Sequence, residues 1–447
     1  VGGAHTIGLI ANASQYGLSA YWYVLGTVSG FLIFAKFLAH RIRSVGDKLN
    51  QVTFADIIED RYDVKTRIIV SVINVVTSIL YMASQIVAIG FLLDMSGLMP
   101  QKWAVLAGSL VVAIYTGRGG LIYISRLAYL HTGIIVLGSV LVTFYSFQGL
   151  DLREVLRTAP NHYGSISQWG WDNIAIVIIS IIGSVVSSSD GYLRCLAARG
   201  ERESRNGLIG AAFLTVVMTV GFLLFGVYSK ISFGETFNTG EIMALLWSQL
   251  PGVMQGVFMV TLLAVIFSTA DISLLTATAG ITKDFYNRLI DIKASQKVLL
   301  KVNYLATVVA ALLSVGVALI TNDLFVIIMW AFKITTICLT VPVVGAYCWA
   351  PGKASGAFYS IIFSFCAAIF WYCSGLAGTT GINEVWIGLA VSFFVYVFDG
   401  LFSSPTEECF RKSQSFCLIT SRAGYNFFSK QIEKEKDLYR HYGEGKI

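Results

Sequence analysis

Residues 261–286, TLLAVIFSTADISLLTATAGITKDFY, place hydroxyl and carboxyl groups inside an otherwise apolar segment. The centre of this segment carries Ser268, Thr269, Asp271 and Ser273. Polar side chains at bilayer depth are costly unless they meet one another, a water-filled cavity or an ion. The polar groups of this stretch are therefore the first place to look for chemistry.

A helix would bring three neutral oxygens of this stretch together. Because a helix turns every 3.6 residues, the carbonyl of Val265 lies one turn before Ser268 and Thr269. Neutral hard oxygens are ligands that an alkali cation accepts. The alternative is that each hydroxyl simply donates to the carbonyl one turn back, and for a single serine this is the favoured interpretation. The cluster as a whole favours a cation site.

The composition defines the class of protein that must position these groups. The chain has 447 residues, of which 55% are hydrophobic and 13% charged, and its mean hydropathy is +0.70. Such a chain is expected to be an all-α polytopic membrane protein, because open sheet edges cannot face lipid. Segments near the length of a bilayer crossing predict eleven spans, at 18–39, 68–93, 103–117, 121–147, 173–190, 207–229, 253–278, 303–320, 324–348, 356–375 and 385–402.

The distribution of basic residues predicts the orientation. Most of the 32 lysines and arginines fall in alternate loops on the side that carries residues 40–67 and the carboxyl-terminal tail. The positive-inside rule places that side in the cytoplasm, within the plasma membrane of the cell (the inner membrane). The net charge of +6 is thus a signature of lipid as a partner, and it implies no nucleic acid.

The first residues read as the middle of a helix without a cap, so we expect the amino-terminal part of the first core helix to be missing before Val1. Gly2 and Gly3 permit a local break that exposes carbonyls to a cation or solute. Close helix packing through small residues is an equal alternative. His5 follows within the same apolar run; taken alone, a core histidine satisfied by a carbonyl is the favoured interpretation, and a substrate ligand is the alternative.

Lys333 lies near the middle of the predicted span 324–348. It is about 15 Å from either end of that span, too deep for easy snorkelling to the interface. An ammonium at that depth must be paired, neutral or exposed to water. This position favours a functional lysine in a solute site.

Several motifs together resemble the sodium:solute symporter family. The matching segments are AVIFSTADISLL at 264–275, ITKDFY at 281–286, VGGAHTIG at 1–8, GRGGL at 117–121, GYLRCLAARGERES at 191–204 and VPVVGAYCW at 341–349. They occur in the family's order. The resemblance extends to about residue 403, so we expect a transporter domain at 1–403 and a cytoplasmic tail or linker at 404–447.

The resemblance implies a leucine-transporter-like inverted-repeat fold, with five plus five core helices, broken first and sixth helices and additional carboxyl-terminal helices. It implies that sodium is bound by the carbonyls of Val1 and Val265 and the hydroxyls of Ser268 and Thr269. It also implies a solute site lined by Gly2, Gly3 and His5 of the first helix and by the helix near Lys333.

One segment departs from the family pattern. Related symporters carry Thr-Asp-x-x-Gln after the GGL turn, and its aspartate serves cation coupling. In this chain the aspartate position is Ala128 and the glutamine position is His131. This departure leaves the sodium stoichiometry open. Asp271 and His131 become candidates for coupling, and the proton becomes a second candidate ion beside sodium.

The sequence therefore predicts a cation-coupled secondary symporter of a small organic solute, and Lys333 suggests an amino or organic acid. No phosphate loop, zinc spacing or nucleophile triad is recognisable, so neither an enzyme nor an organic cofactor is expected. The alternative is a membrane-embedded solute sensor on the same scaffold, because the charged segment after residue 403 could lead to a downstream signalling module. An ion channel is disfavoured, because no carbonyl-lined filter loop is visible.

Overall fold

The computed structural model describes residues 2–49, 51–146, 164–233, 239–402 and 416. Every regular element in these ranges is a helix. Val1 lies outside the described residues, as does the predicted tail 404–447 apart from Phe416. The ring of Phe416 packs 5.6 Å from that of Tyr347, measured between centroids.

The helical elements follow one another along the chain in two halves. The first half contains η1 (Gly3–His5), α1 (Ile7–Tyr16), η2 (Gly17–Tyr21), α2 (Trp22–Ile33), η3 (Phe34–Leu38), α3 (Ala39–Leu49), α4 (Phe54–Arg61), α5 (Val64–Met95), α6 (Gln101–Ser146), α8 (Trp171–Ser187) and α9 (Ser189–Ala197). The second half contains α10 (Glu201–Phe233), α11 (Thr239–Ser248), α12 (Gly252–Ala279), η4 (Gly280–Ile290), α13 (Gln296–Ile320), α14 (Leu324–Cys348), α15 (Ala354–Cys373), α16 (Leu376–Thr380) and α17 (Glu384–Phe402).

The long apolar helices agree closely with the predicted spans. Within the described ranges, nine helices are long and apolar enough to cross a membrane, and the bent pair α8–α9 makes up to ten. The predicted span 324–348 coincides with α14. The predicted span 103–117 is helical but is not among these; it forms the first arm of α6, which breaks at Gly120 with φ 58°.

Two further breaks interrupt helices where polar groups gather. Gly2 is extended, with φ −129° and ψ −170°, and a short 3₁₀ turn links it to α1. Ser188 is also extended and separates α8 from α9, which are bent by 41°. Both breaks leave backbone groups without helical partners, which is the arrangement expected beside a binding site within a membrane.

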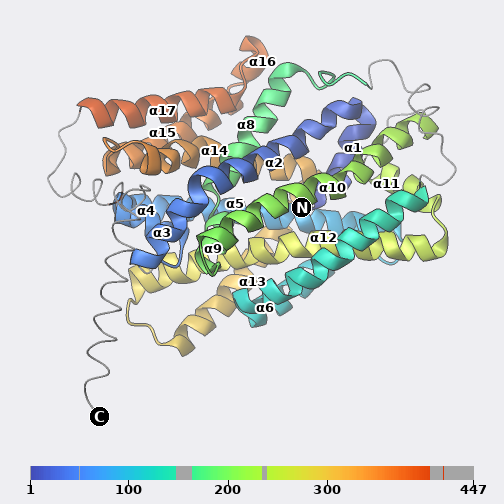
Figure 1. Cartoon of the computed structure of the whole chain (residues 1–447), viewed down its shortest axis with the longest axis horizontal. Coiled ribbons are helices and arrows are strands. Elements are labelled where there is room, and N and C mark those ends of the chain that lie inside the picture. Colours follow the sequence, from blue (N-terminus) through green and yellow to red (C-terminus); the bar gives the residue numbers. More distant parts are fainter. Residues whose placement is uncertain (1, 50, 147–163, 234–238, 403–415, 417–447) are drawn as a thin grey trace.

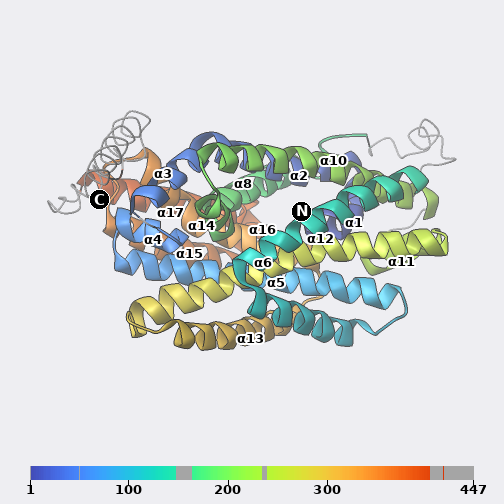
Figure 2. The same ribbon diagram turned by 60° about the horizontal axis from the view of Figure 1, so that its bottom comes forward.

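Helices α5 and α12 run through the middle of the bundle, and α6, α13, α15 and α17 lie toward its outside (Figures 1 and 2). The outer helices carry large exposed apolar side chains, such as Leu305 and Leu312 on α13, each 64% exposed. These faces suit contact with lipid, whereas an aqueous setting would leave them uncovered.

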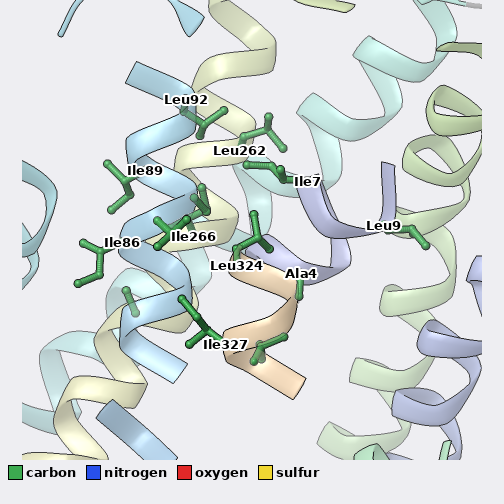
Figure 3. Packing of buried hydrophobic residues seen from close by; sticks show 14 of the residues in the cluster. Ala4, Ile7, Leu9, Ile86, Ile89, Leu92, Leu262, Ile266, Leu324 and Ile327 are labelled. Carbon is green, nitrogen blue, oxygen red and sulfur yellow. The ribbon is translucent and has the colours of Figure 1, made fainter. Parts of the chain in front are cut away.

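The core closes around the amino-terminal turn. Figure 3 shows Ala4 and Ile7 on the side of the core formed by Leu262 and Ile266 of α12 and Leu324 of α14. All five side chains are buried, with at most 2% of their surface exposed. The break at Gly2 is thus held inside the bundle by α5, α12 and α14.

Charged groups join the elements at the end of the molecule that carries α4 and η4. The guanidinium of Arg67, at the start of α5, pairs with Asp56 at 2.7 Å, with Glu59 at 2.6 Å and with Asp284 at 2.8 Å. Arg288 of η4 also pairs with Glu59. These ion pairs connect α4 to the start of α5 and to η4, which continues from α12.

Candidate functional site

A cavity of about 410 Å³ lies between the break at Gly2 and the break at Ser188, and both residues line it. One end reaches Gly2, His5 and Thr269, and the other end opens past Arg194 and Glu203. Side chains from α2, α5, α8, α12 and α14 complete its wall, among them Thr27, Asn74, Thr77, Ser78, Tyr81, Ile181, Thr276, Ile328 and Phe332. The wall is therefore mostly apolar, with hydroxyl and amide groups concentrated near the breaks.

The predicted cation ligands of α12 adopt the geometry expected from the helix. Ser268 Oγ donates to the Val265 carbonyl at 2.8 Å, and Thr269 Oγ1 donates to the same oxygen at 3.4 Å. Thr269 lines the cavity. Both hydroxyls thus make the backbone bonds that the alternative interpretation expects. The same bonds gather three neutral oxygens in one place, and oxygens of this kind fit a sodium ion carried as cargo.

Gly2 meets this group directly. A Cβ atom added to Gly2 would stand 2.9 Å from Thr269 Oγ1 and 3.0 Å from Gln85 Oε1. Since φ of Gly2 is one that any residue can adopt, glycine is needed here for close approach to α12. The structure therefore brings Gly2 and Thr269 together, and the contribution of Val1 lies outside the described residues.

His5 lies at the inner end of the cavity and has a side-chain partner. Its Nε2 is 2.9 Å from Thr27 Oγ1 of α2, and its ring lies 4.7 Å from that of Tyr23 between centroids. On the neighbouring wall, the hydroxyls of Tyr81 and Ser184 are 2.8 Å apart. These groups form a polar patch that a small solute could contact. Gly3 packs behind the patch, against Ala88 of α5.

Lys333 does not line this cavity. Its ammonium pairs with Glu384 Oε1 of α17 at 2.6 Å, and its neighbour Phe332 faces the cavity instead. The burial cost of this charge is thus met by a carboxylate on a neighbouring helix. The depth of Lys333 in its span predicts a partner, and Glu384 is that partner. This arrangement does not favour a contact between Lys333 and the solute.

Asp271 of α12 and His131 of α6 are both buried, on two helices that pack against each other. Asp271 is 1% exposed, and its Oδ1 has no hydrogen-bond partner within the described residues. His131 is 8% exposed, and its Nδ1 is likewise unpartnered among them. A Cβ on Gly138 would overlap the Thr261 hydroxyl.

The close approach of Gly138 to Thr261 aligns α6 with α12. One turn from Gly138, Ile135 belongs to the same buried cluster as Ala264 and Val265. Neither of the two candidate coupling residues, Asp271 and His131, is among the residues that line the cavity.

Aromatic side chains close the cavity at the end opposite Arg194. Trp169 stacks on Tyr16 with centroids 5.5 Å apart, and Phe325 lies 6.0 Å from Trp169. Tyr23 continues the layer, 5.5 Å from Phe325. Within the part of the chain that the structure describes, the cavity is thus open toward the end that carries α4 and η4.

Sequence reasoning missed several groups around the site. Thr27, Tyr81 and Asn74 line the cavity, and Gln85 hydrogen-bonds the amino-terminal break. Asn74 and Gln85 are amides in the interior of the predicted span 68–93, and a polar residue at that depth is itself a signal. Thr27 and Tyr81 give no such signal, because both are common in membrane helices.

Known proteins resemble this chain over most of its length. The model of the sodium:solute symporter family matches residues 1–364. The osmoregulated proline transporter OpuE of Bacillus subtilis is 23% identical over 418 residues, which cover 88% of this chain and 83% of OpuE. The sodium/pantothenate symporter of Haemophilus influenzae is 24% identical over 368 residues, covering 78% of this chain and 75% of its own. These relatives are transporters and not enzymes, and they lend no support to the sensor interpretation.

Solved structures support the fold. A Na⁺-coupled sialic acid symporter in a substrate-bound, outward-open state superposes with a TM-score of 0.73 at 19% identity, covering 90% of this chain and 88% of that one. The inward-facing conformation of Mhp1 superposes with a TM-score of 0.55 at 10% identity, covering 92% and 91%. The leucine-transporter-like fold is thereby confirmed. With its family motifs, its broken helices and the match over residues 1–364, this integral membrane chain belongs to the sodium:solute symporter family.

Proposed function

We propose that the chain is a secondary symporter that uses a cation gradient to carry a small carboxylate-bearing solute by alternating access. The observation that carries this proposal is the contact between Gly2 and Thr269 at the inner end of the cavity. A cation held by Val265, Ser268, Thr269 and the carbonyl of Val1 would join the broken first helix to α12. Binding the cation would thereby order the wall on which the solute rests.

The solute class is argued from the cavity and the relatives. Proline, pantothenate and sialic acid, named for the similar proteins, each carry a carboxylate. In this chain the patch formed by His5, Thr27 and Tyr81 offers ring nitrogen and hydroxyl groups to such an anion. The cation beside Gly2 would supply the countercharge, so the solute would not need Lys333. Gly3 would contribute only backbone.

The orientation is also a proposal. The cavity opens at the end bearing Arg194, Arg199 and Arg202, and the positive-inside rule favours that end as cytoplasmic. The arrangement would then be inward-open, with the carboxyl terminus inside the cell and the chain in the plasma membrane. The aromatic layer of Tyr16, Trp169 and Phe325 would close the outer path.

A proton is the second candidate ion. The buried carboxyl group of Asp271 has an oxygen without a hydrogen-bond partner within the described residues, and Ala128 stands at the position where the family pattern carries an aspartate. Asp271 would thus supply a buried carboxyl group in a chain that lacks the aspartate of the family pattern. A carboxyl group can bind and release a proton, so Asp271 is suited to proton exchange.

Uptake into proteoliposomes tests the proposal. Labelled L-proline, pantothenate and sialic acid would be offered with an inward sodium gradient, an inward proton gradient, both, or neither. We expect at least one solute to accumulate only when a gradient is present. Asp271→Asn should then abolish the response to the proton gradient and leave uptake at a fixed sodium gradient independent of pH. Uptake that ignores both gradients would contradict coupled transport.

A further inference from the structure

The peptide unit between Gly2 and Gly3 is held at both of its polar ends. The Gly2 carbonyl accepts the His5 backbone N–H at 2.9 Å, which closes the 3₁₀ turn. The Gly3 N–H points the other way and donates to Gln85 Oε1 of α5 at 2.8 Å. A buried N–H at a helix break has no helical acceptor, so Gln85 supplies the one that the break removes.

The orientation of the Gln85 amide is set by its neighbours. Its Nε2 donates to Ser84 Oγ at 2.9 Å, and Ser84 Oγ donates in turn to the Tyr81 carbonyl at 2.8 Å. The amide nitrogen therefore faces Ser84, and the amide oxygen faces Gly3. Gln85 is fully buried, so water does not compete for either bond.

Gln85 also stands beside the cation group. The Cβ position of Gly2 lies 3.0 Å from Gln85 Oε1 and 2.9 Å from Thr269 Oγ1, so side chains of both α5 and α12 pack closely against Gly2. The Cβ position of Gly3 is 2.9 Å from the side chain of Ala88, one turn further along α5. The chain at the break is thus packed between α5 and α12, and Gln85 supplies its side-chain hydrogen bond to α5.

We infer that Gln85 is a positioning residue that fixes the broken first helix in the geometry required by the cation site. It acts through the Gly2–Gly3 peptide and sets how tightly the site binds sodium. This inference rests on the proposed function, because it presupposes that a cation binds between Gly2 and Thr269.

The test measures ²²Na⁺ binding to the purified full chain, with choline replacing unlabelled sodium to hold ionic strength constant. Gln85→Met keeps the length of the side chain but removes the acceptor, and it should weaken sodium binding about tenfold, the cost of one unsatisfied buried N–H. Gln85→Glu keeps an acceptor oxygen in either protonation state and should bind sodium as tightly as the wild type or more tightly. Gln255→Met is the matched control: its amide donates to the Trp247 carbonyl, outside the cavity lining, and it should bind normally.

The outcomes separate the inference from the proposed function. If the wild type binds no sodium, the proposed sodium site fails. If the wild type binds sodium and Gln85→Met binds it equally well, only the role of Gln85 fails. If Gln85→Met does not fold, Ser84→Ala takes its place, because it releases the other end of the amide and should weaken sodium binding severalfold. Unchanged binding by Ser84→Ala would then overturn the inference.

Discussion

Gly2 approaches Thr269 so closely that a Cβ atom on Gly2 would stand 2.9 Å from the threonine hydroxyl oxygen. The two residues are far apart in sequence and belong to the broken first helix and to α12. Their contact places the non-helical backbone at Gly2 against the turn of α12 that carries Thr269. An alkali cation requires this kind of convergence of neutral oxygens.

Gly2→Ala tests that convergence. The added methyl must displace Thr269 or Gln85, and overpacking of this kind costs about 1–3 kcal/mol. We expect sodium-driven uptake to be lost while the protein still elutes as a folded species. Gly133→Ala is the control, because a Cβ atom there meets nothing within 4 Å. Normal uptake by Gly2→Ala would show that the close approach is not required.

His5 is predicted to act on the solute and not on the cation. His5→Ala removes the contact with Thr27 and the ring packing on Tyr23. The KM for the solute should rise about tenfold, the equivalent of one hydrogen bond to a polar group, while sodium binding changes by less than about twofold. Titrations of uptake against solute and against sodium measure both quantities, and His40→Ala in α3 serves as the control. A loss of sodium affinity equal to the loss of solute affinity would contradict this division.

The pair of Lys333 and Glu384 is predicted to stabilise the fold without contacting the solute. Lys333→Met or Glu384→Gln alone leaves an uncompensated charge, and each should lower the melting temperature. The double variant should regain most of the loss, because neither charge remains. The KM for the solute should stay unchanged in all three variants. A KM raised by Lys333→Met but not by Glu384→Gln would return Lys333 to the solute site.

The network around Arg67 is predicted to make stability depend on pH. Burial alone would raise the pKa of Glu59, but hydrogen bonds from Arg288 and Arg67 outweigh it and hold that pKa below its ordinary value. A carboxyl group with a lowered folded-state pKa stabilises the protein above its unfolded-state pKa, and the contribution disappears as pH falls through the folded-state pKa.

Thermal unfolding of Glu59→Gln checks this expectation. The variant should melt below the wild type at pH 7, and the difference should shrink as the pH is lowered below about 4. Glu203→Gln, an exposed carboxylate at the same end of the molecule, is the control and should melt like the wild type. A difference between Glu59→Gln and the wild type that persists unchanged in acid would contradict an ionised Glu59 as its source.

Much of the architecture could be predicted from the sequence because the bilayer restricts the choices. Apolar length defines the spans, and the bounds of α14 coincide with the predicted segment. The local group of Val265, Ser268 and Thr269 follows from helical periodicity alone. Glycines in an apolar run indicate a break, and the break at Gly2 lies where they predict it.

Long-range partners could not be predicted in the same way. Depth requires a partner for Lys333, but only the packing of α14 on α17 identifies it as Glu384. Gln85 is recognisable as a buried amide, yet its bond to Gly3 depends on how α5 lies beside the amino-terminal turn. Neither pairing leaves a periodic signal, since each joins separate helices.

Sodium binding by variants of Ser268 and Thr269 tests the central claim most directly. Equilibrium binding of ²²Na⁺ would be measured for the wild type, Ser268→Ala, Thr269→Ala and the double variant. Thr278→Ala is the control, because its hydroxyl donates to the Leu275 carbonyl further along the same helix and it is not among the residues that line the cavity. We predict that each single variant binds at least about tenfold more weakly, as expected for a lost ligand to a charged group, and that the double variant shows no saturable binding. Full-affinity binding by the double variant would contradict a cation site between α12 and the broken first helix.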